Sequence, residues 1–356
     1  MRAARFHNKG DIRVEDVDQP KVTDGKVLVE VEWCGICGSD LHEYLMGPAL
    51  LPVTPHPRTG ECVPMALGHE LCGRIKNPSP GSRFKEGEAV MVDPRVLCGS
   101  CLSCKAGQTH CCSSLGYVGG TTTGGYGEFV AVEEERLYPL GSIPLEHAAV
   151  IEPLAVVQHA VKESGVKDWK DKTVLVLGGG PIGFALMLIL KAHGATNVIV
   201  SEPAIIRREQ GSEYAQAVIN PVKEKVGDRC RELTDGRGVD VVFDCAGVPI
   251  ALEAGFDAIC SSGLYIMVAV WEKPLTLPCW TFLQKHVTVK GVLIFSTEDF
   301  EEVMEMVAKG KIPGYEKLIT GRIGLDDIVK KGFEELVNNK DKHIKILVSP
   351  KNAVAA

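Results

Sequence analysis

The pattern of hydrophobic and polar positions divides the chain into two parts of different character. In the first 150 residues, segment 27–33 alternates like a half-buried strand, and 89–93 predicts a second, shorter strand. Long stretches rich in glycine and proline lie beside these strands, at 47–60 and 77–87. Irregular segments of this length need something to hold them, and a bound metal would do so.

After residue 151 the pattern changes to strands that alternate with helices. Residues 173–177 predict an apolar strand, a helix follows from about 182 to 193, and 197–201 predict the next strand. Apolar strands of this kind are typical of a parallel sheet that helices cover on both faces. The later segments are predicted strands at 239–244, 263–270 and 287–294, an acidic amphipathic helix at 299–309 and a final strand at 344–348.

The charge balance narrows the partners of this 356-residue chain. With 39 lysines and arginines against 46 aspartates and glutamates, the net charge is −7, which disfavours nucleic acid or an anionic membrane as the main partner. No apolar run has the roughly 18 residues of a membrane span, and residues 1–10 lack the apolar core of a signal peptide. We therefore expect a soluble cytoplasmic protein.

A glycine-rich turn follows the strand at 173–177 and opens the next helix. Residues 178–183 read Gly-Gly-Gly-Pro-Ile-Gly and fit the pattern G-x-G-x-x-G. Glycines there permit a tight turn and let the backbone approach a pyrophosphate, which the N–H groups of the helix N-terminus bind. A glycine-rich turn that binds nothing is the alternative. The candidate cofactor-binding residues of this turn are Gly178, Gly180, Pro181, Ile182 and Gly183.

An acidic residue follows the second strand of this part of the chain. Glu202 comes 24 positions after Gly178, where dinucleotide-binding proteins place the carboxylate that binds the adenosine ribose. A carboxylate there repels a 2′-phosphate, so NAD is favoured over NADP as the cofactor. Arg207 and Arg208 lie close by and offer a site for such a phosphate, which keeps NADP as the alternative.

Thirteen cysteines are many for a chain without a secretory signal, and those that cluster indicate a metal site or catalysis. Four of them have the spacing of a closed four-thiolate zinc site, which would order the surrounding loop. A ferredoxin-type iron–sulfur cluster would need a cysteine where Gln108 stands. Spacing alone leaves Cys111 as an alternative to Cys112. The candidate ligands of this structural zinc are Cys98, Cys101, Cys104 and Cys112.

A second set of candidate ligands is spread over 115 residues, from Cys37 through His69 and Glu70 to Glu152. A mixed set of thiolate, imidazole and carboxylate is typical of a catalytic zinc site that keeps one position for water or substrate. Each residue also has an ordinary explanation, because a lone histidine is more often part of the core and Glu152 could cap a helix. No spacing rule joins residues this distant, so the residues alone leave this site open.

These motifs also carry a resemblance to a known family. Segments 33–44, 67–70 and 151–154, the four-cysteine loop and the glycine-rich turn occur in the order seen in zinc-dependent medium-chain alcohol dehydrogenases. The resemblance extends over essentially the whole chain. Within the family, segments 40–48 and 56–61 are most similar to the (R,R)-2,3-butanediol dehydrogenases.

The resemblance implies an α/β fold with two domains. Residues 1–154, completed by 296–356, would form a GroES-like, β-rich catalytic domain. Residues 155–295 would form a Rossmann domain, a doubly wound parallel sheet that binds the dinucleotide. The family also implies an oligomer, with a homodimer or a homotetramer as the two possibilities.

The resemblance further assigns roles to the candidate residues. Cys37, His69 and Glu152 would hold a catalytic zinc, and Glu70 would lie behind them or exchange as a ligand. Whether Glu70 or Glu152 is the ligand stays open. The remaining roles are a proton relay through Ser39 and His42, and a contact of Arg207 with the adenosine ribose held by Glu202.

The activity implied is NAD-dependent oxidation of a small secondary alcohol or vicinal diol, such as 2,3-butanediol, with acetoin as the corresponding ketone. A polyol dehydrogenase acting on sorbitol-like substrates, or an L-threonine dehydrogenase, is the alternative within the same chemistry. A dinucleotide-binding protein without catalysis would be expected to have lost ligands, yet Cys37, His69 and Glu152 are all present. A zinc-ribbon protein that binds nucleic acid would want a basic face, which Lys105 alone does not supply.

Overall fold

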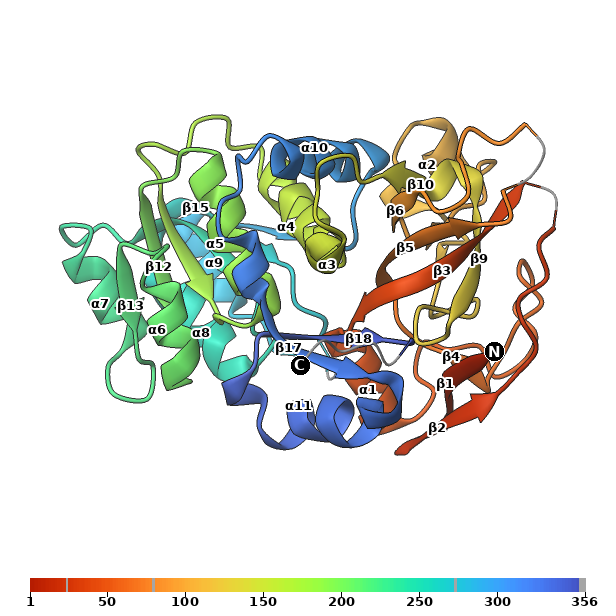
Figure 1. The fold of residues 1–356 in the computed structure, drawn as a ribbon. Coiled ribbons are helices and arrows are strands. Elements are labelled where there is room, and N and C mark those ends of the chain that lie inside the picture. Colours follow the sequence, from red (N-terminus) through yellow and green to blue (C-terminus); the bar gives the residue numbers. More distant parts are fainter. Residues whose placement is uncertain (24, 79–80, 272–273, 352–356) are drawn as a thin grey trace. The chain divides into compact units, whose positions relative to one another are not determined.

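The computed structural model describes the chain except for residues 24, 79–80, 272–273 and 352–356. It divides into two compact units, each described here by itself (Figure 1). The first unit comprises Met1–Glu152, Ser296–Lys309 and Ile319–Ala356, and the second comprises Pro153–Phe295 and Gly310–Leu318.

The second unit is built on a parallel sheet of six strands in the order β13-β12-β11-β14-β15-β16. From the central strand β11 the chain winds outward in one direction and then in the other, which is the strand order of a doubly wound Rossmann sheet. The predicted parallel sheet is therefore confirmed. The strands are β11 (Thr173–Leu177), β12 (Asn197–Ser201), β13 (Ala217–Ile219), β14 (Val239–Asp244), β15 (Ile259–Met267) and β16 (Thr288–Gly291).

Helices connect these strands, and their apolar side chains pack on the sheet. Every side chain of β11 is buried, and so are the eight residues 183–190 of α5, which follows it. A strand and a helix that are both apolar throughout belong to the interior of a layered α/β unit. The helices are α4 (Ile151–Glu163), α5 (Pro181–Ala192), α6 (Ile205–Gly211), α7 (Val226–Glu232), α8 (Pro249–Ala258) and α9 (Cys279–Lys285), and α4 begins within the first unit.

The first unit is rich in β-structure, as predicted for a GroES-like domain. Its main sheet has the order β10-β6-β5-β3-β18-β17, with β9 also pairing with β3, and a smaller sheet has the order β2-β1-β4. A two-stranded ladder joins β7 and β8. The strands are β1 (Arg2–Asn8), β2 (Asp11–Asp16), β3 (Lys26–Gly35), β4 (Met65–Ala66), β5 (Glu70–Lys76), β6 (Ala89–Val92), β7 (Arg95–Val96), β8 (Gly116–Tyr117), β9 (Phe129–Glu133), β10 (Leu137–Pro139), β17 (Ile319–Gly324) and β18 (Lys345–Ser349).

Strands from distant parts of the sequence meet in the main sheet of the first unit. β18 pairs antiparallel with β3, with Leu347 opposite Gly35 and Val348 opposite Cys34 (Figure 1). All five residues of β18 are buried, including the charged Lys345. The late strand is therefore an interior part of the sheet, next to β3, the strand that leads into Cys37.

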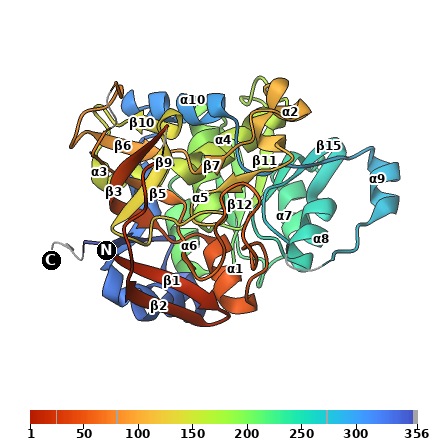
Figure 2. The same cartoon turned by 90° about the vertical axis from the view of Figure 1, so that its right-hand side faces the viewer.

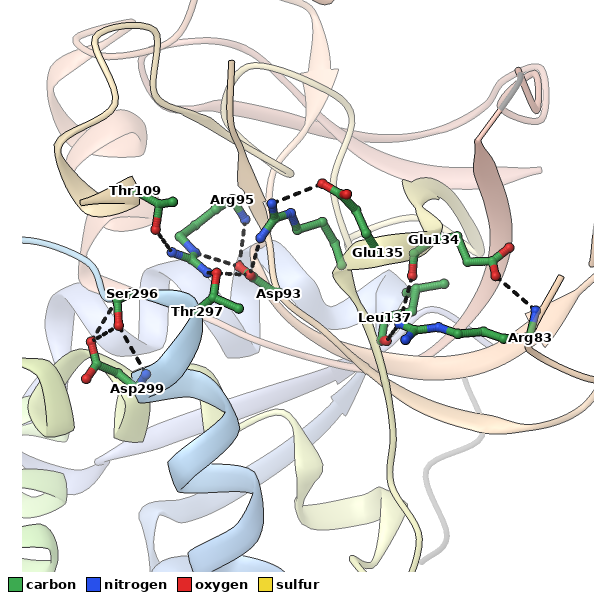
Figure 3. Close-up of polar contacts among 11 residues, drawn as sticks. Arg83, Asp93, Arg95, Thr109, Glu134, Glu135, Leu137, Ser296, Thr297 and Asp299 are labelled. Carbon is green, nitrogen blue, oxygen red and sulfur yellow. Dashed lines mark hydrogen bonds and ion pairs between the residues drawn. The ribbon is translucent and has the colours of Figure 1, made fainter. Parts of the chain in front are cut away.

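A helix that follows the second unit in sequence also belongs to the first unit. Helix α10 (Thr297–Ala308) begins with a capping box, in which the Ser296 hydroxyl accepts from the Asp299 N–H and the Asp299 carboxylate accepts from the Ser296 N–H. Arg95 donates to Thr297 on this helix and to Thr109 in the four-cysteine loop, at 3.0 and 3.1 Å (Figure 3). One buried guanidinium thus joins the two segments.

None of the helices in the described part of the chain combines the length and the apolar character that crossing a bilayer requires.

Candidate metal centres and nucleotide site

Cys37 stands where strand β3 gives way to the short helix α1 (Gly38–Met46), of which it is the N-cap residue. The carboxylate of Asp40 accepts a hydrogen bond from the Cys37 N–H at 3.0 Å and another from the Tyr126 hydroxyl at 2.7 Å. Both Asp40 and Tyr126 are buried, so this bond pair fixes the start of the helix. The predicted relay residues Ser39 and His42 lie on the same helix.

His69 and Glu70 approach Cys37 because β5 pairs with β3. Glu70 is the first residue of β5 and stands opposite Gly35. The ligand atoms of Cys37, His69 and Glu70 all lie within 4.8 Å of one another. A side chain at Gly35 would prevent this arrangement, since its Cβ would meet the Glu70 Oε2 at 2.0 Å. We refer to Cys37, His69 and Glu70 as the mixed cluster.

Two atoms of the mixed cluster fit a bound cation. The Nδ1 of His69 and the Oε2 of Glu70 are buried and have no hydrogen-bond partner among the described residues. Leaving such atoms unpaired in the interior costs about 1–3 kcal/mol each, and more for a charged group. A thiolate, an imidazole and a carboxylate are the ligand types that zinc takes. The residues present therefore suit the metal that the sequence predicts here.

The charges around the mixed cluster are those of a site built for a cation. Burial alone would lower the pKa of His69, but Cys37 and Asp40 together raise it well above its usual value. Burial raises the pKa of Glu152 to about 7, against the lowering influence of His69. Metal ligands must lose their protons to bind. A divalent cation would therefore replace the protons that His69 and Glu152 carry.

Glu152 is buried on α4, and its charge acts on His69 and on Glu70. It does not belong to the three-residue group whose ligand atoms lie within 4.8 Å of one another. The structure thus gathers Cys37, His69 and Glu70 most closely, with Glu152 as a further buried carboxylate beside them. Its assignment as a ligand stays a prediction.

A lysine that the sequence analysis did not single out completes this site. The Nζ of Lys345 donates to the Glu70 Oε1 at 2.6 Å and to the carbonyl of Ile36 at 3.1 Å. The side chains of Lys345 and Glu70 are 2% and 1% exposed. Burial alone would lower the pKa of Lys345, yet Glu70 and Cys37 raise it, which keeps the ammonium charged. The only sequence signal was a charged residue inside an apolar strand.

The four predicted cysteines come together in the loop between β7 and β8. Their sulfur atoms lie within 4.8 Å of one another. The loop also contains two short helices, α2 (Leu102–Lys105) and η1 (Thr109–Cys111). Cys111 is exposed and lies outside this group, which favours Cys112 as the fourth ligand. The backbone N–H of Cys104 lowers the pKa of Cys101 to about 5, whereas burial raises the pKa of Cys104 to about 12. All four thiols would lose their protons on binding a metal.

The glycine-rich turn of the second unit adopts the conformation that its sequence predicts. Gly178 has a φ of +90°, and its N–H donates to the carbonyl of Ser201 at 2.8 Å. A Cβ on Gly183 would meet the carbonyl oxygen of Gly178 at 1.8 Å, so helix and turn pack too closely for any side chain. Gly180 is the N-cap residue of α5 and Pro181 occupies its first turn, followed by Ile182.

Glu202 lies against this turn. One oxygen of its carboxylate accepts from the Gly179 N–H at 2.7 Å, and the other accepts from the Ala204 N–H at 2.7 Å. Arg207 lies on α6, and one of its terminal nitrogens would be 3.5 Å from a Cβ on Gly180. The acid, the turn and the arginine are thus adjacent, which is the arrangement a dinucleotide requires.

Two family models match separate parts of the chain. The model described as the alcohol dehydrogenase GroES-like domain matches residues 23–142, and the model described as zinc-binding dehydrogenase matches residues 181–309. With the relatives described next, these matches show that the chain belongs to the zinc-dependent medium-chain alcohol dehydrogenase family. The family resemblance, the α/β fold and the class of enzyme predicted from the sequence are confirmed. The chemistry of this family involves zinc and a nicotinamide cofactor.

Among the individual relatives, several with high similarity over the whole chain are butanediol dehydrogenases. The chain is 37% identical to the (R,R)-butanediol dehydrogenase of Neisseria gonorrhoeae, over 98% of this chain and 99% of that protein. It is 38% identical to the enzyme of the same name from Saccharomyces cerevisiae, over 99% of each. The crystal structure of 2R,3R-butanediol dehydrogenase from Bacillus subtilis matches with a TM-score of 0.88 at 36% identity, covering 98% of this chain and 99% of that one.

Proposed function

We propose that this protein is an NAD-dependent zinc dehydrogenase that interconverts a small vicinal diol, such as 2,3-butanediol, with its hydroxyketone, such as acetoin. The observation that carries the proposal is the mixed cluster, in which a thiol, an imidazole and a carboxylate come within 4.8 Å of one another. The substrate is proposed from two relatives named (R,R)-butanediol dehydrogenase. They are 37% and 38% identical to this chain, and the matches cover 99% of each relative.

The catalytic site would be formed by the first unit. Cys37 and His69, together with Glu152 or Glu70, would hold the zinc. When bound, zinc acts as a Lewis acid on the alcohol oxygen, and the nicotinamide takes up the hydride. Ser39 and His42 would carry the proton of the substrate hydroxyl outward along α1. Histidine suits this role because its usual pKa lies near neutrality.

The four cysteines would hold a second zinc with a structural role. Four thiolates leave no open position for a substrate, which distinguishes this site from the mixed cluster. Backbone N–H groups already point at these sulfurs, with Cys101 N–H donating to Cys98 at 3.3 Å and Cys104 N–H donating to Cys101 at 3.4 Å. Two zinc ions per chain are therefore proposed.

The second unit would bind the cofactor through the glycine-rich turn and Glu202. NAD is proposed over NADP because the carboxylate of Glu202 is buried beside the turn, where a 2′-phosphate would meet its charge. Arg207 would then lie over the adenosine ribose. The domain division proposed is a catalytic domain of 1–154 with 296–356 and a nucleotide-binding domain of 155–295.

A homodimer or homotetramer is proposed, formed through the edge of the second sheet. Strand β16 is the last strand of that sheet, and helix α9, which comes just before it in sequence, packs against β15 and is labelled at the right of Figure 2. Trp280 and Leu283 on α9 are 70% and 69% exposed, and a large apolar patch on a surface typically marks an interface. The clustered thiols favour the reducing cytoplasm as the compartment.

The test is the rise in absorbance of NADH with NAD and (R,R)-2,3-butanediol, run beside sorbitol, L-threonine and a sample treated with a chelator. Rapid turnover of the butanediol that the chelator abolishes supports the proposal. Turnover of sorbitol or L-threonine instead would retain the zinc dehydrogenase and replace the substrate. With zinc bound and NADP also tried, failure on every alcohol would contradict the proposed activity.

A further inference from the structure

A cavity lies at the edge of the parallel sheet of the second unit that is opposite to the glycine-rich turn. The turn follows the carboxyl end of β11, whereas two of the residues that line the cavity, Lys172 and Asp240, lie at the amino ends of β11 and β14. Its volume is about 460 Å³, within the roughly 300–1,000 Å³ that small-molecule sites occupy. The cavity is therefore large enough for a small ligand and separate from the candidate cofactor site.

A bulge in β15 forms one wall of this cavity. Segment 239–241 of β14 spans the same length of ladder as segment 259–264 of β15, because the register shifts between them. The additional residues of β15 have no partner on β14 in this register, and three of them, Cys260, Ser261 and Ser262, line the cavity. Bulges are common beside binding sites, since they redirect side chains that a regular ladder would hold on the faces of the sheet.

The charged side chains of the cavity leave one positive charge in excess. Arg237 donates to both oxygens of Asp240, at 2.5 and 3.2 Å, and the Thr173 N–H donates to the same carboxylate at 2.8 Å. Burial alone would raise the pKa of Asp240, but these bonds and the nearby Lys172 hold it below its usual value. The carboxylate is thus ionised and balanced by Arg237. The side chain of Lys172 has no hydrogen bond or ion pair among the described residues, so its charge is the excess.

The other side chains of the cavity are neutral. Burial raises the pKa of the Cys260 thiol, which donates to the carbonyl of Ser261 at 3.4 Å. Ser261 and Ser262 are exposed, and each hydroxyl can donate to an acceptor on a ligand. Val166 and Leu264 belong to the apolar part of the wall. An ammonium, two hydroxyl donors and an apolar surface together suit a small organic anion.

We propose that this cavity binds a small organic anion, whose carboxylate or phosphate group contacts Lys172 and the hydroxyls of Ser261 and Ser262 while a short apolar body lies against Val166 and Leu264. Because so small a ligand makes few contacts, we expect an affinity in the millimolar range. The site goes beyond the dehydrogenase activity proposed above and does not depend on it.

The test follows alkylation of Cys260 by N-ethylmaleimide in the full-length, zinc-loaded protein, with each cysteine peptide quantified by mass spectrometry. Cys260 lines the cavity and is 8% exposed, so a ligand in the cavity should shield its thiol. With butyrate or butyl phosphate at about ten times its dissociation constant, competition predicts roughly tenfold slower alkylation. The exposed Cys279 is the internal control and should react at an unchanged rate.

The choice of probes separates the parts of the ligand. Stronger protection by butyrate or by butyl phosphate identifies the head group as carboxylate or phosphate, and either result supports the proposal. Butyramide, which has the same length but no charge, should protect Cys260 much less than butyrate does. Acetate should need about tenfold more ligand than butyrate for half protection, because it buries fewer methylene groups. Protection by neither anion, or equal protection by butyramide and butyrate, would overturn the proposal.

A pair of variants shifts the charge of the cavity in opposite directions. Lys172→Met removes the excess charge and should raise the ligand concentration for half protection about tenfold, whereas Asp240→Asn adds a positive charge and should lower it about threefold. Lys311→Met, which changes an exposed lysine of the same unit outside the cavity, is the matched control and should behave like wild type. A misfolded variant would lose protection in both cases, so opposite shifts exclude that explanation.

Hydrogen exchange of segment 259–264 gives the same half-effect concentrations if the Cys260 thiol resists alkylation, because bound ligand should slow exchange in the bulge. An unchanged half-effect concentration in Lys172→Met, or weaker binding in Asp240→Asn, would overturn the proposal. Neither readout needs turnover, so an enzyme inactive on every alcohol would refute the proposed function and leave this result unaffected.

Discussion

The guanidinium of Arg95 donates two hydrogen bonds to the carboxylate of Asp93, at 2.9 Å from Nε to Oδ1 and at 2.6 Å from Nη2 to Oδ2 (Figure 3). Both side chains are 0% exposed. Arg136 adds a further bond to the same carboxylate at 3.2 Å. Because Arg95 also donates to Thr109 and Thr297, this pair fastens the four-cysteine loop to helix α10.

Removing the arginine should destabilise the protein strongly. Arg95→Met leaves the charge of Asp93 buried with Arg136 alone to balance it, and breaking such a pair lowers the free energy of unfolding by about 3–5 kcal/mol. Equilibrium unfolding in urea measures the change. The matched control is Arg13→Met, whose exposed pair with Asp11 should contribute little to stability. Equal effects of the two substitutions would contradict the role given to Arg95.

The four-cysteine loop should lose its metal when one ligand is removed. We expect Cys104→Ser to carry one zinc less per chain than wild type and to unfold at a lower temperature, because the loop has little core of its own. Cys111→Ser should keep the full zinc content, since Cys111 is exposed and outside the group. Atomic absorption gives the zinc content, and loss of zinc from Cys111→Ser would mean that the ligand set is wrong.

Two glycines of the turn should respond differently to alanine. Gly183→Ala places a Cβ 1.8 Å from the carbonyl oxygen of Gly178, so the turn must shift, at a cost of about 1–3 kcal/mol in stability. The Cβ of Gly180→Ala would contact only the guanidinium of Arg207, at 3.5 Å and beyond, so this variant should fold normally. It should nonetheless bind NAD about tenfold more weakly, because the backbone no longer approaches the pyrophosphate. Urea unfolding and NADH titration separate the two effects.

The cofactor preference should depend on Glu202. Glu202→Ala removes the acceptor of the Gly179 and Ala204 N–H groups and the charge opposed to a 2′-phosphate. We expect kcat/KM with NAD to fall roughly tenfold to a hundredfold, as for a lost charged hydrogen bond, while kcat/KM with NADP rises. Glu209→Ala, which removes an exposed acid on the following helix α6, is the control. An unchanged ratio of NAD to NADP in Glu202→Ala would argue against the assignment.

The sequence located the buried strands best, because an apolar run is a local signal. Strands β11, β12 and β14 begin and end at the predicted residues. Strand β15 begins at Ile259 and not at 263, since the exposed Ser261 and Ser262 interrupt its apolar pattern. The edge strand β16 is shorter than the predicted 287–294, and in the described part of the chain it pairs with β15 alone.

The ligands of the two candidate metal centres differ in how well the sequence alone could predict them. The four cysteines lie within 15 positions of one another, so their spacing predicted the site, although it left Cys111 as an alternative to Cys112. The mixed cluster depends on the pairing of β5 with β3, which no local pattern encodes, and only the family resemblance joined its residues. The sequence did not indicate a role for Lys345, because its contact with Glu70 depends on the pairing of β18 with β3.

Because β18 lies near the end of the sequence, it is synthesised after the other strands of the main sheet. Residues 153–295, most of the second unit, leave the ribosome before β18 does, so the nucleotide-binding sheet can form while the main sheet of the first unit still lacks an interior strand. Until Lys345 emerges, Glu70 has no ammonium beside it. The buried ion pair between Lys345 and Glu70 is therefore one of the last contacts of the first unit that synthesis allows to form.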